Sequence, residues 1–193
     1  FSNNWMGGFA YTWSRQTGNY SGLSSGDEDG RTDTNVQRMF DVWYLCYDKY
    51  LNPIDGPLNV DRTHVIKAYG SYMFPFGLTA GLVLNGMSGT PISTFYTFGS
   101  EGYMPFGRGD AGRTGFLALL DFNLSYDIKL GRNTLQINVN VDNVFNTRTA
   151  MAVDQYYNQG TANLSDEDLL AANWNLDDPE REVIKNPCFM KDR

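Results

Sequence analysis

Few residues in this chain have the types and spacing that chemistry requires. The segment from Gly107 to Gly112 matches G-x-G-x-x-G, a pattern whose glycines let a backbone approach a dinucleotide phosphate. A dinucleotide site also needs a strand before the motif and a helix after it. Here a strand pattern follows the motif, so we expect a loop with glycines at positive φ rather than a nucleotide site.

Catalytic and metal-binding groups are equally sparse. His64 is the only histidine, and no nucleophile–base pair or triad can be built around it. An acidic run in the first third of the chain could attract calcium, but it lacks the full spacing of a calcium-binding loop. Its members are Asp27, Glu28, Asp29 and Asp33. We therefore expect a solvated acidic loop, no enzyme activity, no metal site and no cofactor.

The chain has two cysteines, Cys46 and Cys188, and both fall in segments predicted below to be loops on the same side of a membrane. They could form a disulfide in an oxidising compartment. The sequence determines neither their distance nor their pairing, so the disulfide stays one of two alternatives.

The composition narrows the class of protein. The chain has 193 residues and a net charge of −7, and no basic cluster could neutralise nucleic-acid phosphates. Charged residues make up 19%, below the usual share in soluble domains, whereas aromatic residues reach 15%. With 20 glycines, this composition is typical of an all-β protein. No apolar run is long enough for a transmembrane helix, but a spanning β-strand needs only about 9–11 alternating residues.

Alternation of apolar and polar residues with a period of two dominates the chain. In the clearest stretch, Leu135, Ile137 and Val139 alternate with Gln136 and Asn138. The same pattern predicts antiparallel strands at residues 5–14, 62–74, 78–88, 116–128 and 134–146.

The connections between these strands alternate between long and short. Long segments cover residues 15–61, 89–115 and 147–193, whereas Pro75-Phe76-Gly77 and residues 129–133 are short. Outer-membrane barrels have short periplasmic turns and long extracellular loops. The order predicts a transmembrane antiparallel up-and-down β-barrel. We expect residues 1–193 to be one partial barrel domain, an open fragment of about five strands with long extracellular loops.

A soluble sheet with one face in solvent also has alternating apolar and polar residues. The distribution of charge distinguishes the predicted membrane sheet from such a soluble sheet. Four charges inside the predicted strands occupy the polar positions: Lys67, Asp121, Asp127 and Asp142. A lipid-facing charge costs about 2–4 kcal/mol at mid-bilayer, so lipid would enforce this pattern. Aromatic residues at the ends of the apolar positions predict two membrane girdles, formed by Trp5, Trp13, Tyr72, Phe74, Phe116, Tyr126 and Phe145.

Five strands cannot close a barrel, because strand edges in hydrocarbon would leave backbone groups without hydrogen bonds. We therefore expect two partners for the sheet: outer-membrane lipid and the remainder of the same barrel.

Aromatic residues also crowd the long segments. They could stack on an extracellular ligand or pack the loops on one another, and packing is favoured. These candidate ligand-binding residues are Trp43, Tyr44, Tyr47, Tyr50, Tyr96, Phe98, Tyr103, Tyr156 and Tyr157.

Several short motifs, in this order and spacing, resemble a known family. They are Asp61-Arg62-Thr63-His64, Pro75-Phe76-Gly77, Ser88-Gly89-Thr90-Pro91, Gly109-Asp110-Ala111-Gly112-Arg113-Thr114 and Asp142-Asn143-Val144-Phe145-Asn146. Together they resemble the C-terminal barrel of TonB-dependent outer-membrane receptors, and within these the Oar-type group that carries a carboxypeptidase-regulatory-like domain. The resemblance covers roughly residues 1–150.

The resemblance implies a place in the bacterial cell outer membrane and active uptake of a bulky nutrient. It implies TonB as a partner through a plug domain that this chain does not contain, and an extracellular ligand of unknown identity. Two alternatives remain open, a passive porin-like barrel and a soluble β-sheet binding protein.

Overall fold

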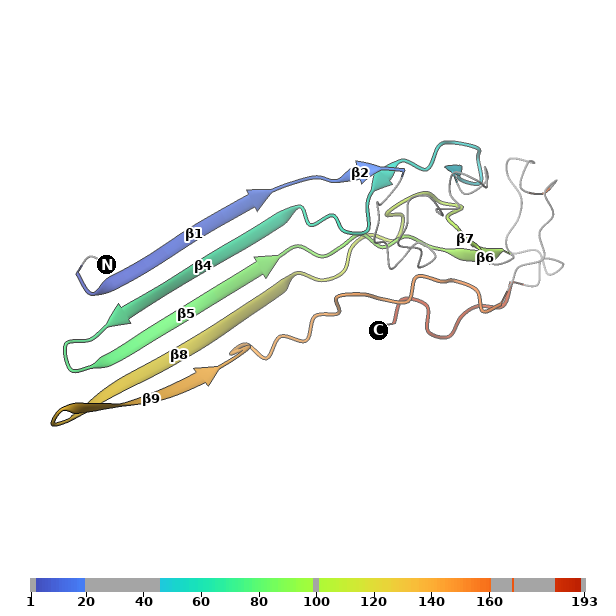
Figure 1. Cartoon of the computed structure of the whole chain (residues 1–193). Coiled ribbons are helices and arrows are strands. Elements are labelled where there is room, and N and C mark those ends of the chain that lie inside the picture. The colour runs from blue at the N-terminus through green and yellow to red at the C-terminus, as the bar shows by residue number, and fades with distance from the viewer. Residues whose placement is uncertain (1–2, 20–45, 99–100, 161–167, 169–182, 192–193) are drawn as a thin grey trace. The chain divides into compact units, whose positions relative to one another are not determined.

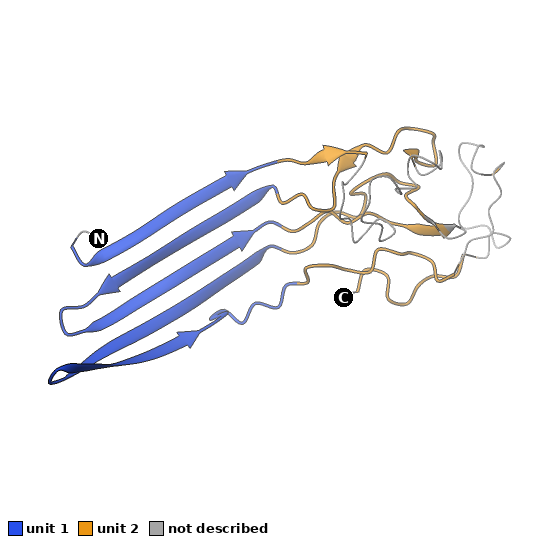
Figure 2. Ribbon diagram, viewed as in Figure 1, with its two compact units in different colours: residues 1–14, 63–88, 116–149 blue, residues 15–62, 89–115, 150–193 orange. Residues whose placement is uncertain are grey.

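The computed structural model describes residues 3–19, 46–98, 101–160, 168 and 183–191. Its regular structure is all β, with antiparallel sheets (Figure 1). Among the described residues, no helix is long and apolar enough to cross a bilayer. The chain separates into two compact units, unit 1 and unit 2, each built from three stretches of sequence (Figure 2).

Unit 1 consists of Phe1–Ser14, Thr63–Ser88 and Phe116–Thr149 and forms a five-stranded sheet. The strands lie in the order β1-β4-β5-β8-β9, and each pairs antiparallel with the next (Figure 1). Their bounds are β1 Trp5–Trp13, β4 His64–Met73, β5 Leu78–Met87, β8 Leu117–Leu130 and β9 Asn133–Val141. In the described part of the chain, β1 and β9 are each paired on one side only, so the sheet is open and no closed barrel is present.

Two short turns produce this up-and-down order. Gly77 ends the β4–β5 turn with φ of 92°, and its amide donates to the carbonyl of Phe74 at 3.1 Å. Gly131 lies in the β8–β9 turn with φ of 64°. Glycine adopts positive φ without the steric cost that other residues meet, so both positions suit tight turns.

The strand register collects most of the apolar residues of the five strands on one face. Phe9 lies opposite Ala68, Ala68 opposite Leu84 and Leu84 opposite Leu120. Directly opposite residues share a face. The apolar face therefore consists of the odd-numbered residues of β1 and β9 and the even-numbered residues of β4, β5 and β8. The remaining strand residues form the polar face.

The last strand is shorter than the predicted range of 134–146, because β9 ends at Val141. Asn143 and Asn146 have positive φ, 51° and 48°, which interrupts the extended backbone. The Asn143 side chain accepts a hydrogen bond from the Thr147 amide at 2.8 Å and donates to the Thr147 carbonyl. The motif 142–146 therefore forms a turn after the strand.

Unit 2 consists of Arg15–Arg62, Gly89–Gly115 and Ala150–Arg193, close to the three segments predicted as long loops. It contains two small antiparallel pairs that were not predicted. β2 Thr17–Gly18 pairs with β3 Gly56–Pro57, and β6 Tyr96–Phe98 pairs with β7 Glu101–Tyr103. Unit 2 also has a buried core of its own, formed by Ile54, Ile92, Phe95, Tyr96, Tyr103 and Met104.

Candidate functional site

The apolar face of the sheet carries exposed side chains from all five strands. Several large apolar side chains on it are about half exposed or more: Leu82 is 45% exposed, Val139 51% and Phe9 73%. Others, such as Leu84, Leu120 and Phe122, are half-buried. The described strands place no Asp, Glu, Lys or Arg on this face, since Lys67, Asp121, Asp127 and Lys129 all lie on the polar face. A contiguous apolar surface across five strands exceeds what soluble monomers normally expose. This face can therefore contact hydrocarbon.

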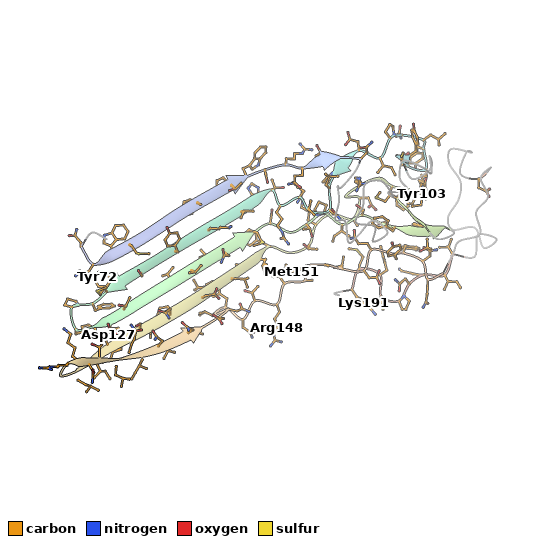
Figure 3. The ribbon with its side chains drawn as sticks, in the orientation of Figure 1. Tyr72, Tyr103, Asp127, Arg148, Met151 and Lys191 are labelled. Carbon is orange, nitrogen blue, oxygen red and sulfur yellow. The ribbon has the colours of Figure 1, made fainter. Side chains whose placement is uncertain are left out.

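Aromatic side chains lie at both ends of the apolar face. At the short-turn end, Trp5 is opposite Tyr72, and the Tyr72 and Phe74 rings meet edge to face at 4.7 Å between centroids. Tyr126 lies at the same end, opposite Leu78. Figure 3 shows Tyr72 near the tip of β4, with Asp127 at the same end of the sheet.

The predicted girdle residues of the other end are distributed differently. Trp13 is opposite His64 at the end where the long connections leave the sheet, and it is 62% exposed. Phe116 directly precedes β8 and is 53% exposed, with its ring close to Gly86 of the apolar face. Phe145 lies in the turn after β9, not within a strand, and is 61% exposed. This end also has an unforeseen contact, because the Tyr11 hydroxyl and His64 Nδ1 are hydrogen-bonded at 2.8 Å.

The polar face carries a ladder of amides and carboxylates between β8 and β9. Asn123 Nδ2 donates to Asn140 Oδ1, and Gln136 Nε2 donates to Asp127 Oδ1 at 2.9 Å. Asn138 continues the ladder by donating to Gln136 Oε1 at 3.3 Å. These groups bond to one another across strands and along β9, and such a face is suited to contact with water or with polar protein.

One cross-strand pair on the polar face shows close packing. Gly8 is opposite Tyr69, and a Cβ placed on Gly8 would lie 2.7 Å from two atoms of the Tyr69 ring. The ring therefore lies against the Gly8 backbone. An aromatic side chain over a glycine of an edge strand helps to define register.

In unit 2, most described loop aromatics pack together. Tyr96 and Tyr103 are buried, at 5% and 2% exposed, and the Tyr96 ring stacks on Tyr157 at 4.9 Å between centroids. Tyr156 packs against Phe95 at 5.5 Å. Burial, followed by the nearby Asp48 carboxylate, raises the pKa of Tyr103 above its usual value. These contacts support packing over ligand stacking for these four tyrosines.

The other predicted loop aromatics have different surroundings. Tyr47 and Tyr50 are 37% and 55% exposed, and the Lys49 ammonium lies 5.0 Å from the centre of the Tyr50 ring. The exposed Tyr50 ring thus makes a cation–π contact rather than packing into the core of unit 2. Trp43 and Tyr44 lie outside the described residues, as does the acidic run 27–33, and the side chain of Phe98 is not described.

An ion pair in unit 2 was not predicted from the sequence. Asp61 is fully buried and pairs with Arg113, whose other amine donates to the Gly89 carbonyl at 3.0 Å. Asp61 Oδ1 also accepts the Gln16 amide at 2.7 Å. The pair therefore ties together both ends of segment 15–62 and both ends of segment 89–115. The sequence signal for this pair was that Asp61 and Arg113 lie in two of the family-like motifs, 61–64 and 109–114.

Among the described residues, the remaining chemical candidates do not form a reactive site. The structure does not join Cys46 to Cys188 in a disulfide, and burial raises the pKa of the Cys46 thiol. Within the described ranges, no group of three or more His, Cys, Asp or Glu side chains could hold a metal ion. Glycines 107, 109 and 112 have positive φ, as expected of a loop.

Comparison with known proteins gives one informative result. No family model matches the chain, and no solved structure matches it. The TonB-dependent transporter Oar of Myxococcus xanthus is 31% identical in an alignment of 165 residues that covers 81% of this chain. The chain spans 15% of the length of that transporter. At a coarse level, this similarity supports a relationship to TonB-dependent receptors, and the relative is a transporter rather than an enzyme.

Proposed function

We propose that the chain forms part of the wall of an outer-membrane TonB-dependent receptor for a bulky nutrient, with the apolar face in contact with lipid. The observation that supports this most directly is the register, which collects apolar residues from five strands on one face and every strand charge on the other. Alternate exposure to lipid and to an interior is the pattern of membrane strands.

The aromatic residues support the same orientation in the bilayer. Rings such as Trp5 and Tyr72 at one end and Trp13 and Phe116 at the other suit the two membrane–water interfaces. Strands β4 and β5 have 10 residues each, which matches the roughly 9–11 residues that a tilted strand needs to span a bilayer.

The proposal assigns different parts to the two units. The sheet of unit 1 forms barrel wall, with the polar face toward the lumen and the open edges of β1 and β9 paired to further strands of the same barrel. Unit 2 forms the extracellular loops. Exposed side chains of unit 2 such as Tyr47 and Tyr50 then contact the ligand, and a plug domain elsewhere in the receptor links the barrel to TonB.

Depth-dependent fluorescence quenching tests the lipid contact. In a receptor barrel that contains this chain and has its native tryptophans replaced by Phe, including the four of this chain, Leu82→Trp places a reporter on the apolar face and Val83→Trp places one on the polar face. After reconstitution in vesicles, we expect lipids with brominated acyl chains to quench the reporter at position 82 strongly and the reporter at position 83 weakly. Leu82 and Val83 are 45% and 43% exposed, so the pair is matched for accessibility. Equal quenching would contradict the proposal.

A further inference from the structure

The polar face contains a hollow that the proposed function does not use. It has a volume of about 270 Å³ and is lined mainly by two adjacent rows of polar-face residues that cross the sheet. The first row comprises Met6, Ser71, Gly81, Asn123 and Asn140; in the second, Tyr69, Val83 and Asp121 are neighbours and Asp142 follows the end of β9.

The hollow exists because Gly81 has no side chain. A Cβ at Gly81 would have its nearest neighbours at 3.8 Å, an ordinary contact distance, so packing does not require glycine there. Gly81 also lies inside β5 and is not among the residues with positive φ. Glycine weakens the interior of a strand and often marks a place where a ligand approaches the backbone. Gly8 differs, because the Tyr69 ring occupies the space that its Cβ would need.

The lining is rich in acceptors and negative charge. Asp121 and Asp142 both line the hollow, and no cation among the described residues forms an ion pair with either carboxylate. Asp121 uses Oδ1 to accept the Asn143 amide at 2.8 Å, which leaves Oδ2 able to accept from a ligand. Like charges close together on a sheet repel each other, and a bound cation would relieve this repulsion.

The other walls suit the rest of a cationic side chain or small molecule. Tyr69 presents an aromatic ring held against Gly8, and Met6 and Val83 present apolar surface. A ring face attracts a cation within about 6 Å. The alkyl stem of an amine or guanidine can lie along apolar side chains while its charged head meets carboxylates.

We propose that this hollow binds a cationic organic group, a guanidinium or ammonium on an alkyl stem. The group could belong to a small molecule or to a Lys or Arg side chain of another polypeptide segment. The inference goes beyond the proposed function, and it does not depend on that function because the hollow lies on the face opposite the one assigned to lipid.

The test uses the full chain in detergent micelles, with its fold checked by circular dichroism. n-Butylguanidinium is titrated against the side-chain amide NMR signals of Asn123 and Asn140, and n-butylurea serves as the neutral probe of similar shape. We expect the guanidinium to shift both signals in a saturable way that weakens with added salt, and the urea to shift neither. Equal responses to the two probes, or no response to either, would overturn the proposal.

Variants localise the site. Asp121→Asn should weaken guanidinium binding roughly two- to fivefold, the range of one partly exposed charge pair, and Gly81→Leu should abolish it by filling the hollow. Asp127→Asn and Thr79→Leu are matched controls on the polar face outside the hollow, and both should bind as the unmodified chain does. Loss of binding in the controls to the same extent would contradict the assignment. If a variant fails to fold, the comparison of the two probes on the unmodified chain still decides the question.

A second probe identifies the source of the cation. The blocked pentapeptide Gly-Ala-Arg-Ala-Gly presents the same guanidinium on a peptide backbone. Tighter binding of the peptide than of n-butylguanidinium would assign the site to a polypeptide segment, and equal affinity would assign it to a small cation. Both outcomes support a cationic ligand, whereas binding of neither probe overturns it.

Discussion

Replacing Leu82 by arginine is the most direct energetic test of the lipid-facing surface. Leu82 lies on the apolar face, four positions after the start of β5 at Leu78 and five before its end at Met87. At about 3.3 Å per residue, it is about 13–17 Å along the strand from either end. A tilt near 45° converts this to a depth of about 9–12 Å from each end. Leu82 therefore lies close to the middle of a hydrocarbon band of about 25 Å.

The expected cost follows from this depth. An arginine at the bilayer midplane of a barrel destabilises the folded state by about 2–4 kcal/mol. The matched variant is Val83→Arg, at the next position but on the polar face, opposite Asp121. There the guanidinium stays in a polar environment and gains up to about 1 kcal/mol from the carboxylate. We expect the two variants to differ by at least about 2 kcal/mol, which is about a 30-fold difference in the folding equilibrium constant.

The assay is urea-dependent folding, in lipid vesicles, of the receptor barrel that contains this chain, followed by circular dichroism. Leu82→Arg should lower the urea midpoint well below that of the unmodified chain, and Val83→Arg should leave it nearly unchanged. If both arginines lower stability equally, or if only Val83→Arg does, the assignment of the faces is wrong. A shift for Leu82→Arg that is as large in water without lipid would also refute the argument.

Three further predictions concern packing and ionisation. Arg113→Met removes the ion pair between the Arg113 guanidinium and the buried Asp61 carboxylate and should destabilise unit 2 by about 1–3 kcal/mol. The cost is below that for a fully buried pair because Arg113 is 36% exposed, and amide hydrogen exchange in unit 2 measures it. Gly8→Ala should displace the Tyr69 ring and destabilise the sheet by about 1–3 kcal/mol in urea denaturation. The folded chain keeps the Tyr103 proton above about pH 10, whereas the unfolded chain releases it, so unit 2 should lose stability as the pH rises above this value. Tyr103→Phe should remove this loss, and hydrogen exchange at two pH values measures it.

Each of these predictions has a control and a contradicting result. For the ion pair, Arg132→Met in the exposed β8–β9 turn should leave exchange in unit 2 unchanged, and an equal effect would point to general loss of charge. For Gly8, the control is Gly81→Ala, which has space for its Cβ and should cost nothing measurable. A harmless Gly8→Ala would show that the Tyr69 ring is not fixed there. For Tyr103, the control is Tyr50→Phe at an exposed position, which should still lose unit 2 stability above about pH 10. If Tyr103→Phe also loses stability in this pH range, the reasoning is refuted.

The sheet of unit 1 follows closely from local sequence patterns. The alternation in residues such as Leu135, Gln136 and Ile137 specifies which side chains share a face, because side chains of an extended strand alternate with a period of two. The short turn at Pro75-Phe76-Gly77 then requires its two strands to pair antiparallel. Both signals lie within a few residues, so one sequence is sufficient to detect them. The end of β9 was missed because Asn143 adopts positive φ, which its side-chain bonds to Thr147 stabilise.

Unit 2 depended on contacts that no local pattern encodes. Asp61 and Arg113 are 52 residues apart, and Tyr96 and Tyr157 meet although neither lies in a periodic segment. The sequence therefore determined the sheet, its two faces and the position of its charges. Only the tertiary structure decided which loop aromatics are buried, that the cysteines are not joined, and that Gly81 opens a hollow beside Asp121. The physical reason is that strand periodicity is a property of the backbone, whereas burial and pairing depend on which distant segments meet.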